Sequence, residues 1–481
     1  MKLLKILTPF TLPFLLAACG DDDIDTISTQ APDTYEFASL TDSSAASSVD
    51  YKEATTRLVL IKELEHLIGS DYLQSYGAAE VTASNIADAK TAVLTLLNTI
   101  YSGGTGTDGL SSQNIYDLYD PDNLESDTVT SIKSYTFTGN TPTFDQLSQN
   151  INLKAVMPGT AYELHNRNDS DVGQFIGWSI TGKSNGDLYP DLLIQEWFNK
   201  IATLATDGDS STKFTYPNIN YQALISSFLS ASIPYSQVSH RYLSEDALNA
   251  DNSTENQSQT YTSLEHNFDM AFGYFGTLTT AKNASLDYLI AANDNSKADL
   301  DNLLNSSVFA TAAAAAQRDL QSPLADINFS NSIVKSFLNG RTVISTPSEE
   351  LESDEQKALI QTQANTILTN WEQTLAATVS FHLNGVFDNG TADNGNFEDG
   401  IINPDYSKHW SHAKGYALAL QFNPNSTITS TELTNIHTLI SNKPHSKEPT
   451  MPAYLSEIVA ARDSIQDAYG FSLEDIQGWN P

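Results

Sequence analysis

Apolar residues recur at helical spacing through most of this chain, and this pattern limits the possible fold more than any other feature. The stretch Tyr51–Ile68 places Leu58, Ile61 and Leu64 on one helix face. Strand-like segments are few, and Thr128–Phe137 is the clearest of them. We therefore predict an all-α fold with few short strands. Further helices are predicted over Ser84–Tyr101, Pro190–Ala205, Ala310–Leu320, Ala358–Leu383 and Ala453–Tyr469.

The first residues form an export signal of the bacterial lipoprotein type. A short basic region with Lys2 and Lys5 precedes an apolar run over Ile6–Ala18, which is too short and too rich in proline to span a bilayer. The run ends in Leu16-Ala17-Ala18-Cys19, and Cys19 is the only cysteine of the chain. We predict that residues 1–18 are a signal peptide and that Cys19 is lipidated with a diacylglyceryl group and an N-acyl chain such as palmitate.

The residues after Cys19 predict a flexible tether over residues 19–34. They include Asp21, Asp22 and Asp23 and then a Ser/Thr/Pro-containing stretch with little apolar surface to bury. Gly20, rather than aspartate, follows the cysteine, a pattern that resembles lipoproteins of the outer membrane. We expect a protein of the cell envelope, attached by lipid to the outer membrane and facing the periplasm or the cell exterior.

The charge of the chain excludes one large class of partners. The formal net charge is −35, so the protein is repelled by nucleic acid and by anionic lipid headgroups. We expect no nucleic-acid partner. Because the lone cysteine leaves no internal disulfide, stability must come from a hydrophobic core, and the predicted mature chain is long enough for one.

Two histidine motifs are the best candidates for chemistry. Tyr261–Gly276 places His266 beside Asp269, three residues later on one helix face, and Glu265 adjoins them. An imidazole and a carboxylate placed in this way can bind a metal ion or share a proton. The alternative is a structural histidine that is oriented by its neighbouring aspartate.

The second motif, His409-Trp-Ser-His412, places two imidazoles three residues apart if the segment is helical. Gly415-Tyr416 follows it, just as Gly273-Tyr274 follows the first motif, and 143 residues separate His266 from His409. This echo suggests two helical halves, residues 35–250 and 260–481. If the halves present their motifs to a common interface, the candidate metal ligands are Glu265, His266, Asp269, His409 and His412. Two separate structural histidines are the alternative.

Two further motifs match known patterns only in form. Gly177–Ser184 satisfies the P-loop pattern, but no helix is predicted to begin at Lys183, so we expect no nucleotide site. Asp388–Gly400 resembles a calcium loop, but it fails the EF-hand template at the sixth and twelfth positions. We interpret it as part of a polar loop over Asp388–Pro404; others are predicted at Gly103–Asn114, Asn249–Thr260 and Thr346–Asp354.

Several short segments together resemble an uncharacterised family of bacterial lipoproteins that is similar to the imelysin-like proteins. They are Tyr35-Glu36-Phe37, Val49-Asp50-Tyr51 with Arg57-Leu58, Leu264 through Gly276, and Lys408 through Pro424. The resemblance implies a predominantly helical domain over residues 35–481, built as two bundles that form one compact unit. It also implies an association with iron uptake.

The sequence departs from the G-x-H-x-x-E motif that imelysin-like proteins carry. Leu264 and Ser407 stand where the motif has glycine, and Asp269 and His412 stand where it has glutamate. His445-x-x-Glu448 supplies the glutamate, but Lys443 replaces the glycine. These departures weaken the case that this chain has the peptidase activity once assigned to the family. They also leave the identity of any divalent metal open.

Three functions remain at this point. The first is a cell-envelope binding protein for a metal ion or a metal-containing ligand in iron uptake. The second is a metal-dependent peptidase or hydrolase with His266, His409 and His412 as ligands and Glu265 or Asp269 as the base. The third is a helical glycan-binding lipoprotein that stacks sugars on Trp178, Trp197 and Trp410. We expect a small-molecule or metal ligand, and binding rather than catalysis.

Overall fold

The computed structural model describes residues 30–41, 47–69, 73, 85–103, 152–158, 175–207, 214–215, 218–256, 259–293, 308–324, 326–347, 353–392, 403–445 and 450–481. Within these ranges the regular secondary structure is helical, and β-type pairing is limited to two isolated bridges, Thr215 with Asn220 and Glu255 with Thr262. The all-α prediction is therefore confirmed. The strand-like segment Thr128–Phe137 lies outside the described residues.

The helices predicted from periodicity are all present. They are α1 (Lys52–Gly69), α3 (Ile86–Asn98), α5 (Pro190–Thr206), α11 (Ala310–Gln321), α13 (Ser353–Ala392) and α16 (Met451–Tyr469). The largest difference is in α13, which is 40 residues long, about 60 Å, and exceeds its predicted range at both ends. The polar loop predicted from Asp388 is therefore wrong as far as Ala392, because the helix continues and packs Gly390 against Leu455 and Met451.

The structure contains further helices that were not predicted from periodicity or were recognised only through their histidines. They are α6 (Tyr221–Ser236), α7 (Glu245–Leu248), α8 (Ser263–Phe275), α9 (Leu286–Ala291), α12 (Phe329–Ile344), α14 (Pro404–Ala419), α15 (Ser430–Ile440) and α17 (Leu473–Gly478). Helix α6 is buried on every side. Its serines satisfy their hydroxyls locally, as Ser227 does by donating to the Ala223 carbonyl at 2.6 Å. A helix surrounded by protein needs no polar face, so it shows no amphipathic period.

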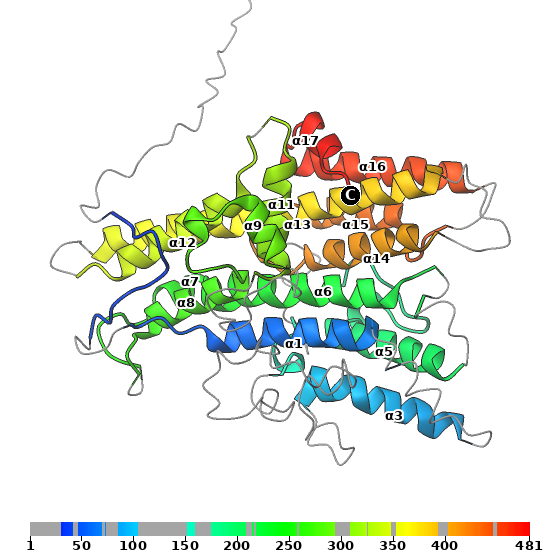
Figure 1. Ribbon diagram of the computed structural model, residues 1–481, viewed down its shortest axis with the longest axis horizontal. Helices are drawn as coiled ribbons and strands as arrows, with labels where there is room; N and C mark the ends of the chain where they lie inside the picture. Colours follow the sequence, from blue (N-terminus) through cyan, green and yellow to red (C-terminus); the bar gives the residue numbers. More distant parts are fainter. Residues whose placement is uncertain are drawn as a thin grey trace, which may run out of the picture.

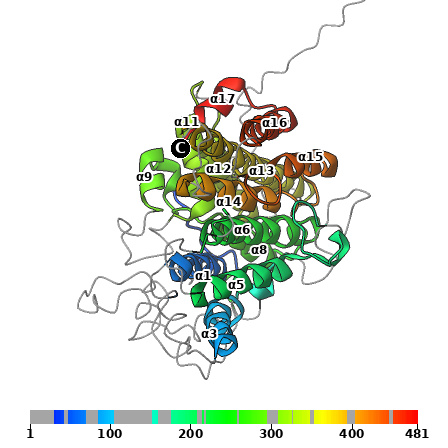
Figure 2. The same cartoon turned by 90° about the vertical axis from the view of Figure 1, so that its right-hand side faces the viewer.

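The helices stack in successive layers, which Figures 1 and 2 show from two directions. From one end to the other the layers run from α3 and α5 through α1 and α6 to α14, then α13 and finally α16. Helix α13 follows the long axis and packs against α12, α14 and α16. The crossing of α6 with α14 joins the earlier helices to the later ones, and the cavity described below lies beside it.

A single hydrophobic core connects these layers, from Tyr35 near the start of the described residues to Trp479 near their end. The division into halves at residues 250 and 260 stays a prediction, as does the tether. No helix among the described residues is long and apolar enough to cross a membrane. The predicted signal peptide and Cys19 lie outside the described residues.

Candidate functional site

The carboxylates of the first histidine motif are held by a buried arginine of α12. Arg341 pairs with Glu265 through Nη2 and with Asp269 through Nε, both at 2.9 Å, and all three side chains are fully buried. Burial raises the pKa of Asp269 to about 6, although the Arg341 charge opposes the shift. These contacts give both predicted metal ligands a structural role, because their oxygens already accept hydrogen bonds inside the core.

The same cluster holds the segment that precedes α1. The Tyr35 hydroxyl donates to Asp269 at 2.9 Å, and the Asp50 backbone N–H donates to the other Asp269 oxygen at 3.3 Å. Arg341 Nη2 donates to the Ser48 hydroxyl at 2.6 Å. The cluster therefore pins Tyr35, Ser48 and Asp50 against α8 and α12.

His266 lies apart from this ion-pair cluster on the same helix. Its half-buried ring stacks on Tyr261, with ring centroids 4.5 Å apart and planes inclined by 10°. Burial lowers its pKa, so the imidazole is neutral near pH 7. The ring therefore stacks on Tyr261 rather than pairing with Asp269, and a metal-ligand role for His266 stays a prediction.

The second motif lies next to a further histidine, on α13. His382 of α13 approaches His409 of α14 with 3.0 Å between the two Nδ1 atoms. Its ring stacks on that of His412 with 4.8 Å between the ring centroids. Burial lowers the pKa of His382 well below its usual value and that of His412 to about 3. We call His382, His409 and His412 the histidine cluster.

A buried arginine without a carboxylate partner lies next to the histidine cluster. The Arg318 guanidinium of α11 covers the Phe381 ring at 3.8 Å from its centroid. None of its nitrogens has a hydrogen-bond partner among the described residues, and burial lowers its pKa to about 9. Its charge adds to the causes that keep the pKa of His382 low. The histidine cluster is therefore a neutral set of imidazoles in a positively biased environment.

The two motifs occupy different parts of the bundle, α8 beside α12 and α14 beside α15 (Figure 1). Each motif contacts its own partners, so the structure shows two clusters rather than one shared site. In the part of the chain that the structure describes, no group of three His, Cys, Asp or Glu side chains is arranged to hold a metal ion. Stacked rings such as His382 and His412 present their faces to each other, so their nitrogens do not converge on one point. The metal-ligand prediction stays a prediction.

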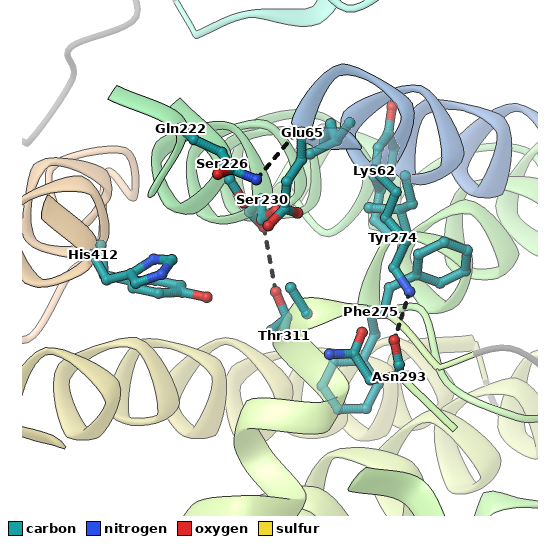
Figure 3. Close-up of a pocket in the computed structure, with 15 residues that line it drawn as sticks. Lys62, Glu65, Gln222, Ser226, Ser230, Tyr274, Phe275, Asn293, Thr311 and His412 are labelled. Carbon is teal, nitrogen blue, oxygen red and sulfur yellow. Dashed lines mark hydrogen bonds between the residues drawn. The ribbon is translucent and has the colours of Figure 1, made fainter. Parts of the chain in front are cut away.

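A cavity of about 400 Å³ lies beside the crossing of α6 and α14 (Figure 3). This volume is within the range of about 300–1,000 Å³ typical of small-molecule sites. Helix α6 contributes a polar stripe, Gln222, Ser226 and Ser230, whose spacing of four residues keeps the side chains on one face. Helix α14 contributes His412 and Tyr416, so the histidine cluster borders the cavity.

Helix α1 supplies the charged groups of the cavity, Lys62 and Glu65. The Lys62 ammonium donates to the Asn293 carbonyl at 3.1 Å and lies 5.1 Å from the centre of the Phe309 ring. Gln222 donates to the backbone carbonyl of Glu65 at 3.3 Å and links α6 to α1. Thr311 at the start of α11 completes the polar lining, whereas Leu58, Ile61 and Phe275 form its apolar part.

The repeated Gly-Tyr pairs acquire a physical explanation in this cavity. A Cβ atom at Gly273 would lie 2.5 Å from the Cβ atom of Tyr51, just before α1, and 3.0 Å from that of Ala54 in α1. One at Gly415 would lie 2.1 Å from the Ser227 hydroxyl in α6. Each glycine therefore permits a close helix crossing. The next residue, Tyr274 or Tyr416, lines the cavity in both cases. The repeat of the Gly-Tyr pair is visible in the sequence, but the position of the two tyrosines at a cavity is not.

The remaining motifs have structural explanations. No helix starts at Lys183, and α5 begins only at Pro190, which supports the rejection of the P-loop. Trp197 and Trp410 are 1% and 0% exposed, so neither can stack a sugar. Trp410 instead donates from its indole N–H to the Tyr454 hydroxyl at 2.8 Å. The end of the calcium-like segment, residues 393–400, lies outside the described residues.

Comparison with known proteins gives a match for one part of the chain. Residues 199–370 match a family model described as Domain of unknown function (DUF4856). The matched range includes α6, α8 and α11, which contribute the polar stripe, Tyr274 and Thr311 to the cavity. No curated protein and no solved structure matches the chain.

Proposed function

We propose that this protein is a lipid-anchored binding protein of the cell envelope that holds a small polar ligand in the cavity between α1, α6, α8, α11 and α14. The observation that carries the proposal is the lining of that cavity. Side chains from five helices meet there, and polar groups at helical spacing lie beside apolar ones around the cavity. Pockets that combine apolar surface with a few convergent polar groups are typical of small-molecule sites.

The neutral histidines and the buried ion pair favour binding over catalysis. His412 has a pKa of about 3, so it is poorly suited to accept a proton near neutral pH. The carboxylates proposed as a catalytic base, Glu265 and Asp269, pair with Arg341. The resemblance to imelysin-like lipoproteins also supports a binding role, and a metal-containing ligand in iron uptake stays within the proposal.

Filling the cavity should abolish ligand binding. Ser226 lies on the polar stripe and is 7% exposed, so a Ser226→Trp variant places an indole in the space that the ligand would occupy. We expect the purified wild-type protein to release a small molecule on denaturation, detected by mass spectrometry, and the variant to release none. Ser456→Trp on the exposed face of α16 is the matched control and should release as much as wild type. Equal release from all three proteins would contradict the proposal.

Replacement of Cys19 should remove the membrane attachment. A Cys19→Ser chain lacks the thiol that receives the diacylglyceryl group, so we expect a soluble or uncleaved precursor that contains no labelled fatty acid. Metabolic labelling followed by membrane fractionation measures both properties. Fatty-acid incorporation by the Ser variant equal to that of wild type would show that the lipoprotein assignment is wrong.

A further inference from the structure

The two charged residues of the cavity lie one turn apart on α1 and point in different directions. Lysine and glutamate at this spacing commonly pair with each other on a helix surface. Here Lys62 reaches toward Asn293 and Phe309, whereas Glu65 extends toward the α6 stripe near Ser230 (Figure 3). The cavity therefore has a positive side and a negative side.

The negative side consists of Glu65 and the groups around it. Among the described residues its carboxylate has neither an ion pair nor a hydrogen bond. The Tyr416 phenol lies within its electrostatic reach, because the Glu65 charge adds to burial in raising the pKa of Tyr416 to about 12. A carboxylate placed in a cavity of neutral hydroxyls offers a counter-charge to an ammonium group.

The positive side combines Lys62 with the start of α11. The ammonium lies over the ring of Phe309, which is the N-cap residue of α11 and supplies no capping side chain. The next two residues, Ala310 and Thr311, line the cavity. The uncapped first turn of a 12-residue helix adds partial positive charge to that of the lysine. A carboxylate is the group that this side would accept.

We propose that the cavity binds a small dipolar molecule, an amino acid or a dipeptide, with its carboxylate toward Lys62 and the start of α11 and its ammonium toward Glu65. The polar stripe of α6 lies on the Glu65 side of the cavity (Figure 3) and supplies hydroxyl and amide partners for the rest of the ligand. This inference rests on the proposed binding function and names the class of its ligand.

Calorimetric titration with three matched dipeptides tests the ligand class. The probes are alanyl-alanine, its N-acetyl derivative without the ammonium, and its C-terminal amide without the carboxylate. We expect alanyl-alanine to bind and each derivative to bind at least about tenfold more weakly, since each leaves one charged side of the cavity without its partner. Equal affinities for all three would overturn the dipolar class, as would no binding of alanyl-alanine or of any free amino acid at millimolar concentration.

Two charge-removing variants assign the ends of the ligand. Glu65→Gln should weaken alanyl-alanine binding at least about tenfold and leave the binding of the N-acetyl derivative unchanged. Lys62→Met should weaken alanyl-alanine binding similarly and leave the binding of the amide unchanged. A variant that weakens all probes equally would contradict the assignment, provided that circular dichroism shows a folded protein. The wild-type protein could release a ligand that lacks one of the two charges, while the Ser226→Trp variant releases none. That result would overturn the proposal of a dipolar ligand and leave the proposed binding function intact.

Discussion

Replacing Arg341 by methionine should lower the free energy of unfolding by about 3–5 kcal/mol, the usual cost of breaking a buried ion pair from one side. The substitution leaves the Glu265 and Asp269 carboxylates inside the core without a counter-charge, and it removes the hydrogen bond to Ser48. Urea unfolding followed by circular dichroism measures the loss. The exposed pair between Lys200 and Glu196 supplies the control, because Lys200→Met should cost no more than about 1 kcal/mol.

The effect of Arg341→Met should depend on pH in a defined direction. Asp269 in the folded wild type has a pKa of about 6, above its value in the unfolded chain, and removal of Arg341 takes away the charge that opposes this rise. A group with a raised pKa contributes stability at low pH that is lost as the pH rises through that value. The loss caused by Arg341→Met should therefore be smaller at pH 5 than at pH 8. A loss below about 1 kcal/mol at pH 8 would contradict the structural role of the cluster.

Placing a single methyl group at Gly415 should separate α14 from α6 and lower the free energy of unfolding by about 1–3 kcal/mol. A Cβ atom there would meet the Leu224 carbonyl oxygen and the Phe228 backbone nitrogen, both at 2.9 Å, in addition to the Ser227 hydroxyl. Backbone atoms cannot rotate away, so the helices must move apart. The loss should appear even though alanine has the higher helix propensity by about 1 kcal/mol.

Gly390→Ala is the matched control for Gly415→Ala. Both glycines lie inside helices, but a Cβ atom at Gly390 would meet the ends of the Leu455, Met451 and Tyr406 side chains rather than backbone. The Leu455 and Met451 ends can adjust, so we expect this variant to stay within about 1 kcal/mol of wild type. Thermal unfolding of the pair separates the two cases. Equal stabilities of the two variants would show that the crossing of α6 and α14 tolerates a wider spacing.

The amphipathic helices could be predicted from sequence because each buries one face and exposes another. Periodicity located α1, α5 and α11 to within two residues at each end. It missed α6, whose serines interrupt the apolar pattern while the helix itself is buried on all sides. It also ended α13 too early, because the polar residues after Leu383 still continue the helix.

The candidate site was predicted only in part, since its residues meet through tertiary packing. The sequence singled out His412, which does line the cavity, and Asp269, which belongs to the Arg341 cluster instead. The partner Arg341 lies 72 residues beyond Asp269 in the chain, so no local spacing could reveal the pair. The repeated Gly-Tyr pairs were the one sequence signal for the cavity. A glycine at a close helix crossing places the residue after it beside the crossing, where the cavity lies.

A crystal structure of the protein bound to the small molecule that it releases on denaturation tests the binding function directly. We expect electron density for that molecule in the cavity beside Ser226, Ser230 and Tyr416, with one charged group near Glu65 and the other near Lys62. Density for the ligand at any other place on the protein, with only water in this cavity, would show that the cavity is not the binding site.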